Sequence, residues 1–332
     1  MATIKETNYL AITAMLAART SGMLSGERME RMIAAPSDDE AVKVLEECGY
    51  GDLSGQSLNE INAALEKHVA AIFDEVENMA PEKALVQMFR LKYDFHNIKT
   101  IIKSHGASVD GSSLLSQRGS VDVGQLQEAF RSGEYAMIPT ALAEAMQEAS
   151  STLSRTANPQ LADFSLDRAY FVEMAKLADS VADSRFAKDY VRLLIDSANI
   201  RSAVRTWRMG KDADFLRLAL IPGGEVSADN VALADSGDAL ADLYRATHVG
   251  SAVDAAAAAV SGGSLTAFEK ACDNAVMQFV REAKIMRFGA AHVVSYLAAM
   301  ENETTAARMI LAGRHAGLKP DTIRERLRDT YA

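Results

Sequence analysis

Apolar residues recur at helical spacing along almost the whole chain. Ala, Leu, Met, Glu and Arg fill long stretches, while no sustained run alternates Val, Ile or Thr with polar residues. The six prolines fall where helices begin or loops turn. Pro36 leads into a helix start, Pro81 opens a helix that ends near His105, and Pro320 begins the last helix. The pattern predicts an all-α fold.

One short pattern occurs three times, at intervals of roughly 100 residues. The copies are Asp94-Phe-His-Asn97-Ile-Lys99, Asp196-Ser-Ala-Asn199-Ile-Arg201 and Glu303-Thr-Thr-Ala306-Ala307-Arg308. In each copy the acid shares a helix face with its third and fourth neighbours, and the basic residue at the fifth position points elsewhere. We therefore expect the basic residue to bond a neighbouring helix, and we expect the chain to be a triplicated helical unit.

The length of the chain agrees with three domains. A chain of 332 residues allows two or three domains of ordinary size, and the repeat favours three. Small, polar, glycine-containing segments follow the first two motif helices, beginning at Gly106 and at Gly210. We predict helical repeats at residues 1–106, 107–210 and 211–332.

The net charge and the cysteines indicate which partners are disfavoured and in which cellular compartment the protein is expected. The formal charge of −10 opposes nonspecific binding to nucleic acid or to an anionic bilayer. Cys48 and Cys272 are isolated in the sequence, which is typical of a reducing compartment and predicts a cytoplasmic protein. No stretch approaches the roughly 20 apolar residues of a membrane span, and the apolar segment that starts at Leu10 is interpreted as an amphipathic first helix.

The sequence contains no complete catalytic or metal-binding signature. It has no Gly-x-x-x-x-Gly-Lys-Ser/Thr loop, no His-Glu-x-x-His pair, and no cysteine pair at zinc-ligand spacing. We therefore predict no catalytic residues, no cofactor and no metal. Asp179 and Asp183 stand at a spacing that could hold Mg²⁺ in a helical prenyl-transfer enzyme, but their context favours a solvated helix end.

The repeated residues are predicted to be structural, with direct contact to a partner as the alternative. A repeated acid on a half-buried helix most often bonds a backbone end or a basic residue of the adjoining helix. The structural set is Asp94, Asn97, Lys99, Asp196, Asn199, Arg201, Glu303 and Arg308. A second set occupies one helix face beside Trp207 and is either a solvated face or a docking strip for an acidic partner helix. It consists of Arg201, Arg205 and Arg208.

Taken together, these segments resemble the C subunit of the archaeal and bacterial V-type ATP synthases, a family related to the d subunit of the vacuolar ATPase. The resemblance covers the whole length. Its most specific parts are the first two motif copies and the C-terminal segment from Tyr296 through Gly313-Arg-His-Ala-Gly-Leu. The segment Ala18-Arg-Thr-Ser-Gly-Met-Leu-Ser-Gly-Glu is also similar to the family's opening. The third copy departs from the family pattern, since Ala306 and Ala307 replace an Asn and a large apolar residue.

The resemblance implies a funnel of three similar helical domains on the cytoplasmic face of a membrane rotor ring. Its cavity would receive the central shaft, built from the D and F subunits, and its base would contact the proteolipid ring. Such a protein would be a non-catalytic coupler that passes torque between shaft and ring, without inserting into the bilayer. A free-standing helical-repeat scaffold that binds a protein or peptide in a groove is the alternative.

Overall fold

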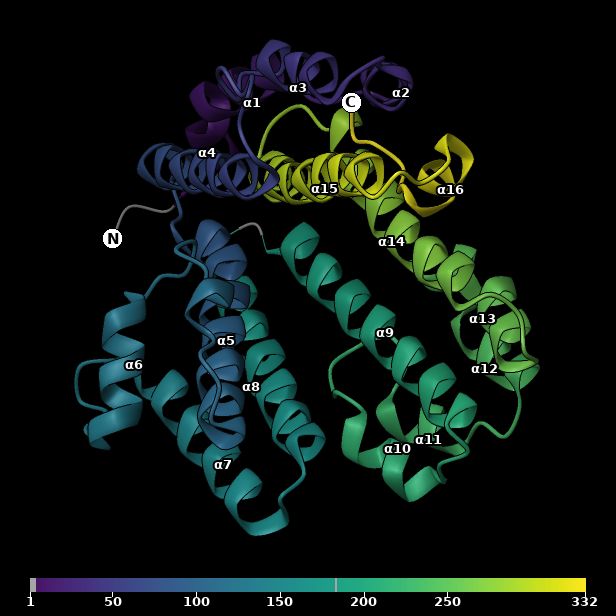
Figure 1. Cartoon of the computed structure of the whole chain (residues 1–332). Coiled ribbons are helices and arrows are strands. Elements are labelled where there is room, and N and C mark those ends of the chain that lie inside the picture. Colours follow the sequence, from purple (N-terminus) through teal and green to yellow (C-terminus); the bar gives the residue numbers. More distant parts are fainter. Residues whose placement is uncertain (1–3, 183) are drawn as a thin grey trace.

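The computed structural model describes residues 4–182 and 184–332, and within these ranges its regular structure is helical, with no strand (Figure 1). The predicted all-α fold is confirmed. Helix starts follow ordinary capping chemistry. The Ser37 hydroxyl accepts the backbone N–H of Glu40, and Ser57 forms a reciprocal capping box with Glu60. Pro320 is the first residue of the last helix, as its position in the sequence predicts.

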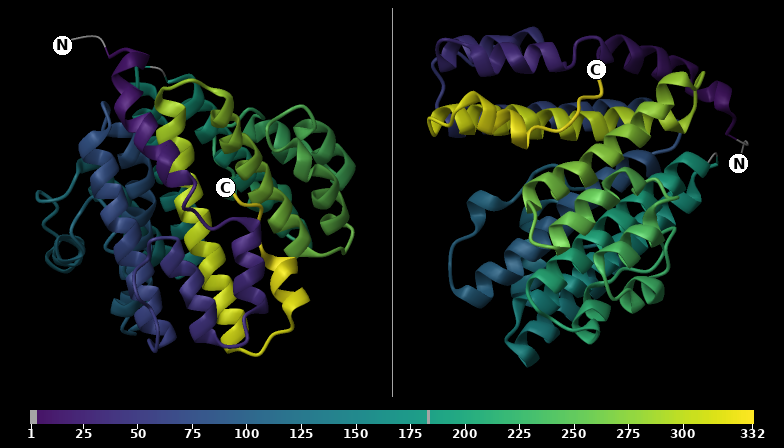
Figure 2. Two further views of the ribbon diagram at one scale, coloured as in Figure 1. Left: turned by 90° about the horizontal axis from the view of Figure 1, so that it is seen from above. Right: turned by 90° about the vertical axis from the view of Figure 1, so that its right-hand side faces the viewer.

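One group of helices combines both ends of the chain and forms the upper layer in Figure 1 and in the right-hand view of Figure 2. Helix α15, near the C-terminus, contacts α1, α2, α3, α4 and α16. The bounds of this group are η1 (Glu6–Tyr9), α1 (Leu10–Thr20), α2 (Gly26–Ala34), α3 (Asp38–Glu47), α4 (Leu58–Met79), α15 (Ala290–His315) and α16 (Pro320–Arg326).

A second group lies below the first, at the left in Figure 1. Helices α5, α7 and α8 pack on one another, and α6 packs on α5. The bounds are α5 (Ala84–Ala107), η2 (Ser112–Leu114), α6 (Val123–Ser132), α7 (Thr140–Thr156) and α8 (Pro159–Ser180).

The third group lies at the right in Figure 1, where α9 contacts α10, α11, α13 and α14. Helix α12 packs mainly on α13, and α14 reaches up to α15. The bounds are α9 (Arg185–Arg208), α10 (Ala213–Ala219), α11 (Ala228–Leu233), α12 (Gly237–Tyr244), η3 (Gly250–Ala252), α13 (Val253–Val260), α14 (Leu265–Arg281) and η4 (Glu282–Ile285).

Each of the three motif copies lies on a long helix that is paired with a second long helix. The pairs are α5 with α8, α9 with α14, and α15 with α4. One large hydrophobic core joins all three groups, while a second core is built from α2, α3, the start of α4 and the C-terminal half of α15. Ala306 and Ala307 are buried in the second core, where their small side chains let α15 approach its neighbours closely.

The contacts of α5 and α9 lie mostly with helices that follow them in the sequence. Domain limits at 106 and 210 would instead join each of these motif helices to the segment before it. The three-domain division with those limits stays a prediction, as does the funnel.

Candidate functional site

The carboxylate of Asp94, on α5, fastens the loop that enters α6. It is fully buried and accepts hydrogen bonds from the backbone N–H of Ser120 (3.1 Å), the hydroxyl of Ser120 (2.6 Å) and the backbone N–H of Val121 (3.0 Å). Asp122, the next residue, is the N-cap of α6. The carboxylate therefore holds the chain where this short helix begins.

Asp196 makes the same connection in the third group. This carboxylate, on α9, is fully buried and accepts the backbone N–H groups of Glu225 (2.9 Å) and Val226 (3.3 Å). Ser227 follows as the N-cap of α11. The acid thus bonds the same structural position in both copies, the residue just before an N-cap.

The third acid finds its equivalent partner at the other end of the chain. Glu303, on α15, accepts the backbone N–H of Leu24 at 2.7 Å and the Tyr50 hydroxyl at 2.7 Å. Ser25 is the N-cap of α2, so Leu24 corresponds to Val121 and Val226. The N-terminal segment therefore supplies the part of the repeat that follows α15.

The asparagine of the motif pairs with a loop residue through both of its polar atoms. Asn97 donates to the carbonyl of Ser116 and accepts the backbone N–H of Ser116, both at 2.8 Å. Asn199 does the same with Ile221, again at 2.8 Å in both directions. Both amides are fully buried. Each side chain therefore pairs with the backbone of one loop residue in both directions and holds the loop against the helix.

The basic residue of each copy bonds an acid on the paired long helix. Lys99 reaches Asp167 on α8 at 2.5 Å, and Arg201 reaches Glu269 and Asp273 on α14 at 2.8 and 2.5 Å. Arg308 pairs with Glu66 on α4, and Arg118 bonds the same oxygen of Glu66. These ion pairs join the two long helices in each group.

The proposed arginine strip has partners within the chain. Arg205 pairs with Glu269 at 2.6 Å, and Arg208 donates to the carbonyl oxygens of Ala259 (2.8 Å) and Gly263 (3.0 Å). Together with the contacts of Arg201, these bonds fasten α9 to α14, to the last turn of α13 and to the loop after it. A docking role for this strip stays a prediction.

Burial raises the pKa of all three motif acids. The effect outweighs the hydrogen bonds from the loop, which favour the charged carboxylate, and it brings the pKa of Asp196 to about 6. For Asp94 and Glu303 the pKa is also raised, with burial again as the largest cause. These carboxyl groups thus sit where ionisation is costly, as expected of buried structural acids.

A repeated glycine, which lies outside the three motif copies, accompanies the acids. A Cβ atom on Gly119 would lie 2.3 Å from an oxygen of Asp94, and one on Gly224 would lie 2.1 Å from an oxygen of Asp196. Each glycine stands two positions before the residue whose N–H the acid accepts, and Gly22 holds this place in the third copy. The pattern Gly-x-Val/Leu-Asp/Ser, present at all three places, is the sequence signal that could have revealed these partners.

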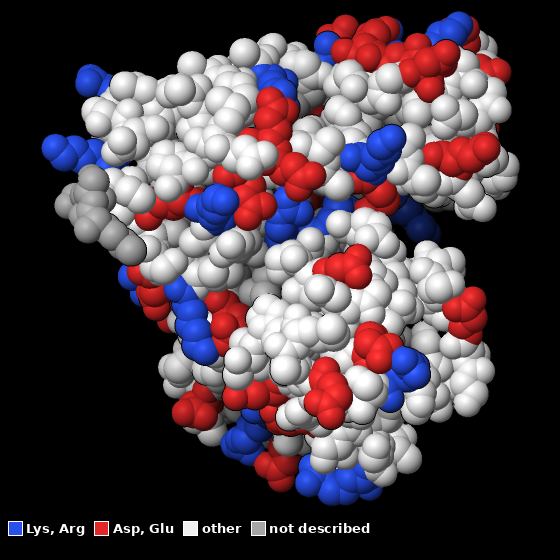
Figure 3. All heavy atoms as spheres, turned by 90° about the vertical axis from the view of Figure 1, so that its left-hand side faces the viewer, with Lys and Arg blue, Asp and Glu red and all other residues white. Residues whose placement is uncertain are grey.

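A cavity of about 1350 Å³ lies where α4, α5, α8, α15 and the segment around η2 meet. Two motif residues, Lys99 and Arg308, are in its wall. In the space-filling view of Figure 3, basic and acidic side chains gather at the waist between the upper layer and the groups below, and the surface is hollowed there.

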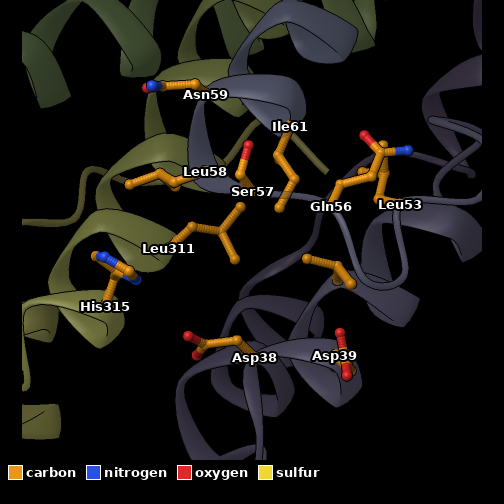
Figure 4. A pocket seen from close by; sticks show the side chains of 11 residues that line it. Asp38, Asp39, Leu53, Gln56, Ser57, Leu58, Asn59, Ile61, Leu311 and His315 are labelled. Carbon is orange, nitrogen blue, oxygen red and sulfur yellow. The ribbon is translucent and has the colours of Figure 1, made fainter.

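A smaller cavity of about 390 Å³ lies between α3, the start of α4 and the end of α15 (Figure 4). Two acids from α3 and His315 line it together with apolar residues. Asp38 pairs with Arg314 at 3.0 Å, and Asp39 accepts the backbone N–H of Gly55 at 3.1 Å. The two carboxylates thus connect α3 to α15 and to the loop before α4.

Within residues 4–182 and 184–332, no cluster of three or more His, Cys, Asp or Glu side chains could hold a metal ion. Asp179 pairs with Lys188 at 2.9 Å, while Asp183 lies outside the described residues. Across the same ranges, none of the helices combines the length and hydropathy needed to cross a bilayer.

The comparison that decides the family covers nearly the whole chain. The model of the ATP synthase (C/AC39) subunit family matches residues 12–326. The chain belongs to the ATP synthase C/AC39 subunit family. Membership makes it a component of an A/V-type ATP synthase complex, and the resemblance stated from the motifs is confirmed.

Relatives within the C/AC39 family match at nearly full length. The C subunit of the A-type ATP synthase of Haloferax volcanii is 27% identical, over 98% of this chain and 99% of the relative. The C subunit of the V-type sodium ATPase of Enterococcus hirae is 20% identical over 97% and 99%, and that of the A-type ATP synthase of Methanocaldococcus jannaschii is 22% identical over 96% and 86%. The family likeness therefore extends across all three helical groups.

Proposed function

We propose that this chain is the non-catalytic rotor component that couples the central shaft, made of the D and F subunits, to the proteolipid ring. It receives the shaft in a socket and transmits torque for ion transport. The observation that carries this proposal is the match of the C/AC39 family along residues 12–326, with relatives named as the C subunits of an A-type ATP synthase and of a V-type sodium ATPase.

A torque-bearing body must resist shear between its parts, and this chain is braced across its groups. Glu301, on α15, accepts bonds from Tyr93 (2.5 Å) and Lys92 (3.1 Å) on α5. The C-terminal tail is fastened to α14, since Arg328 pairs with Asp273 at 2.8 Å and Arg281 donates to the carbonyl of Thr330. These contacts support the function of a stiff coupling piece.

The proposed placement is peripheral, at the cytoplasmic face of the membrane, with the three helical repeats forming a funnel around the shaft. Its support is the family membership together with the open cavity between the upper layer and the second group. The chemistry of ATP would belong to other components of the complex, and this chain would only carry force.

Copurification tests the proposal directly. The chain is tagged in its source organism, membranes are solubilised gently, and the captured proteins are identified by mass spectrometry. We expect the nucleotide-binding subunits, the D and F subunits and a proteolipid. Recovery of the tagged chain alone, while the rotary complex remains intact in the same cells, would instead support a free-standing helical scaffold.

A further inference from the structure

The cavity between α4, α5 and α8 carries an excess of positive charge in an acidic protein. Its wall contains two acidic side chains, Glu66 and Asp167, and the chain as a whole has a formal charge of −10. The basic side chains in the same wall are Lys67, Lys92, Lys99, Arg118 and Arg308. A cavity lined by one sign of charge attracts groups of the opposite sign.

Lys92 pairs with Glu301, which lies outside this wall, but these three acids do not neutralise the five basic side chains. Glu66 bonds both Arg118 and Arg308, and Asp167 bonds Lys99. Arg118 is buried, with 6% of its surface exposed, so it holds Glu66 in place from inside, whereas the side chain of Arg308 is 32% exposed and shares the same oxygen of Glu66. Lys67 is exposed and forms no ion pair with any described residue. Lys67 and Arg308 are therefore the basic side chains that can donate to a negatively charged ligand in the cavity.

The same wall offers apolar surface. Leu114 is 65% exposed although it lines the cavity, and Phe95, Leu115 and Tyr170 line it as well. The volume, about 1350 Å³, exceeds the roughly 300 to 1,000 Å³ of ordinary small-molecule pockets. An amphipathic helix fits this combination better than a small anion does, because it can bury apolar side chains and present carboxylates together.

We propose that this cavity binds an acidic, amphipathic helix end of a protein partner, with Leu114 contacting its apolar face and Lys67 and Arg308 its carboxylates. The assignment rests on the proposed function, which identifies the partner as the shaft made of the D and F subunits. The cavity lies to one side of the chain, between the upper layer and the second group. A partner bound there would contact two of the three helical groups, which suits a shaft that is itself asymmetric.

The test measures binding of the purified D–F shaft to the full-length chain by calorimetry at about 100 mM salt, where surface charges still act over about 10 Å. The variants are Lys67→Glu and Leu114→Ser, both at exposed positions, so the helical circular dichroism and Tm should not change. The matched controls are Lys319→Glu and Leu233→Ser, which are exposed but lie outside the cavity.

We expect each cavity variant to raise the Kd at least tenfold, with both controls within about twofold of wild type. Added salt should weaken wild type more than Lys67→Glu. Wild-type affinity in both cavity variants would overturn the assignment and leave the proposed function standing. Failure of wild type to bind the shaft would overturn the proposed function itself.

Inorganic pyrophosphate serves as a second probe. If millimolar pyrophosphate raised the Tm of wild type but not of Lys67→Glu, while both bound the shaft equally, the cavity would be a small-anion site and the helix assignment would be wrong.

Discussion

The carboxylate of Glu303 accepts the backbone N–H of Leu24 at 2.7 Å, although the two residues stand 279 positions apart in the sequence. The equivalent bonds of Asp94 and Asp196 reach only 27 and 30 positions ahead. The repeat that begins with α15 is thus completed by the first residues of the chain. The two ends are joined through a bond that the other two repeats make locally.

The close approach of Gly119 to Asp94 predicts that Gly119→Ala destabilises the protein. The new methyl group would lie 2.3 Å from Oδ1 of Asp94, and three hydrogen bonds fix that carboxylate in place. We expect the free energy of unfolding, measured in urea by circular dichroism, to fall by roughly 2 to 4 kcal/mol. Gly224→Ala should behave in the same way against Asp196.

Gly22→Ala is the matched control for these two variants. It holds the same place in the repeat, but the nearest atom to its Cβ would be the carbonyl oxygen of Arg19 at 3.4 Å. We expect a change of less than about 1 kcal/mol. Equal losses at Gly22 and Gly119 would contradict the explanation by steric contact with the acid.

The paired hydrogen bonds of Asn97 predict a large cost for Asn97→Ala. The change removes two bonds and leaves the N–H and C=O of Ser116 without these partners. We expect a loss of roughly 2 to 4 kcal/mol in the free energy of unfolding. Asn302→Ala, which removes a single bond to the carbonyl of Asp329 at an exposed site, should cost less than about 1 kcal/mol. Similar losses for the two variants would argue against the role of Asn97 as a loop clamp.

The raised pKa of Asp196 predicts a specific dependence of stability on pH. Burial raises this pKa to about 6, whereas aspartate in an unfolded chain titrates near about 4. Between these values the native state binds more protons than the unfolded state. The contribution of Asp196 to stability is therefore fully present below about pH 4 and falls as the pH rises through 6, by up to about 3 kcal/mol.

Urea unfolding of wild type and Asp196→Asn at pH 4, 5, 6 and 7 measures this effect, since the variant lacks the titrating group. The difference in unfolding free energy, wild type minus variant, should shrink with rising pH. A constant difference over this range would show that Asp196 does not titrate there.

The shared contact of Glu66 predicts that Glu66→Gln destabilises the protein. Burial raises the pKa of Glu66, but Arg118 and Arg308 outweigh this effect and lower it. Without the carboxylate, buried Arg118 and its neighbour Arg308 lose their common counter-charge. We expect a loss of roughly 2 kcal/mol, discounted for the partial exposure of Glu66.

Glu47→Gln is the control for this change. Its partner Arg31 is half exposed, so water replaces the lost ion pair, and the melting temperature should barely change. A drop in melting temperature as large as that of Glu66→Gln would show that ion pairing in general, rather than the shared contact at the cavity, sets the cost.

Much of the local structure could be predicted because it depends on neighbouring residues. Ser37 and Pro320 mark helix starts through their own chemistry, and the spacing of Lys99 from Asp94 places the base on a different face from the acid. The acids that pair with Lys99 and Arg308 could not be predicted. Asp167 and Glu66 lie on other helices, and the spacing of apolar residues does not reveal at what angle two helices pack. The Gly-x-Val/Leu signal is too short to identify without knowing which loop returns to the helix.

The sequence by itself determined that the chain is helical, that one motif is repeated three times, and which family the chain belongs to. These properties depend on residue order alone. Only the tertiary structure decided that Leu24 completes the repeat of Glu303, and that five basic side chains surround one cavity. The physical reason is that the Leu24–Glu303 bond and the cavity both bring together segments far apart in the chain. Such contacts are set by how long helices cross and bury their apolar faces, and helical periodicity carries no information about that geometry.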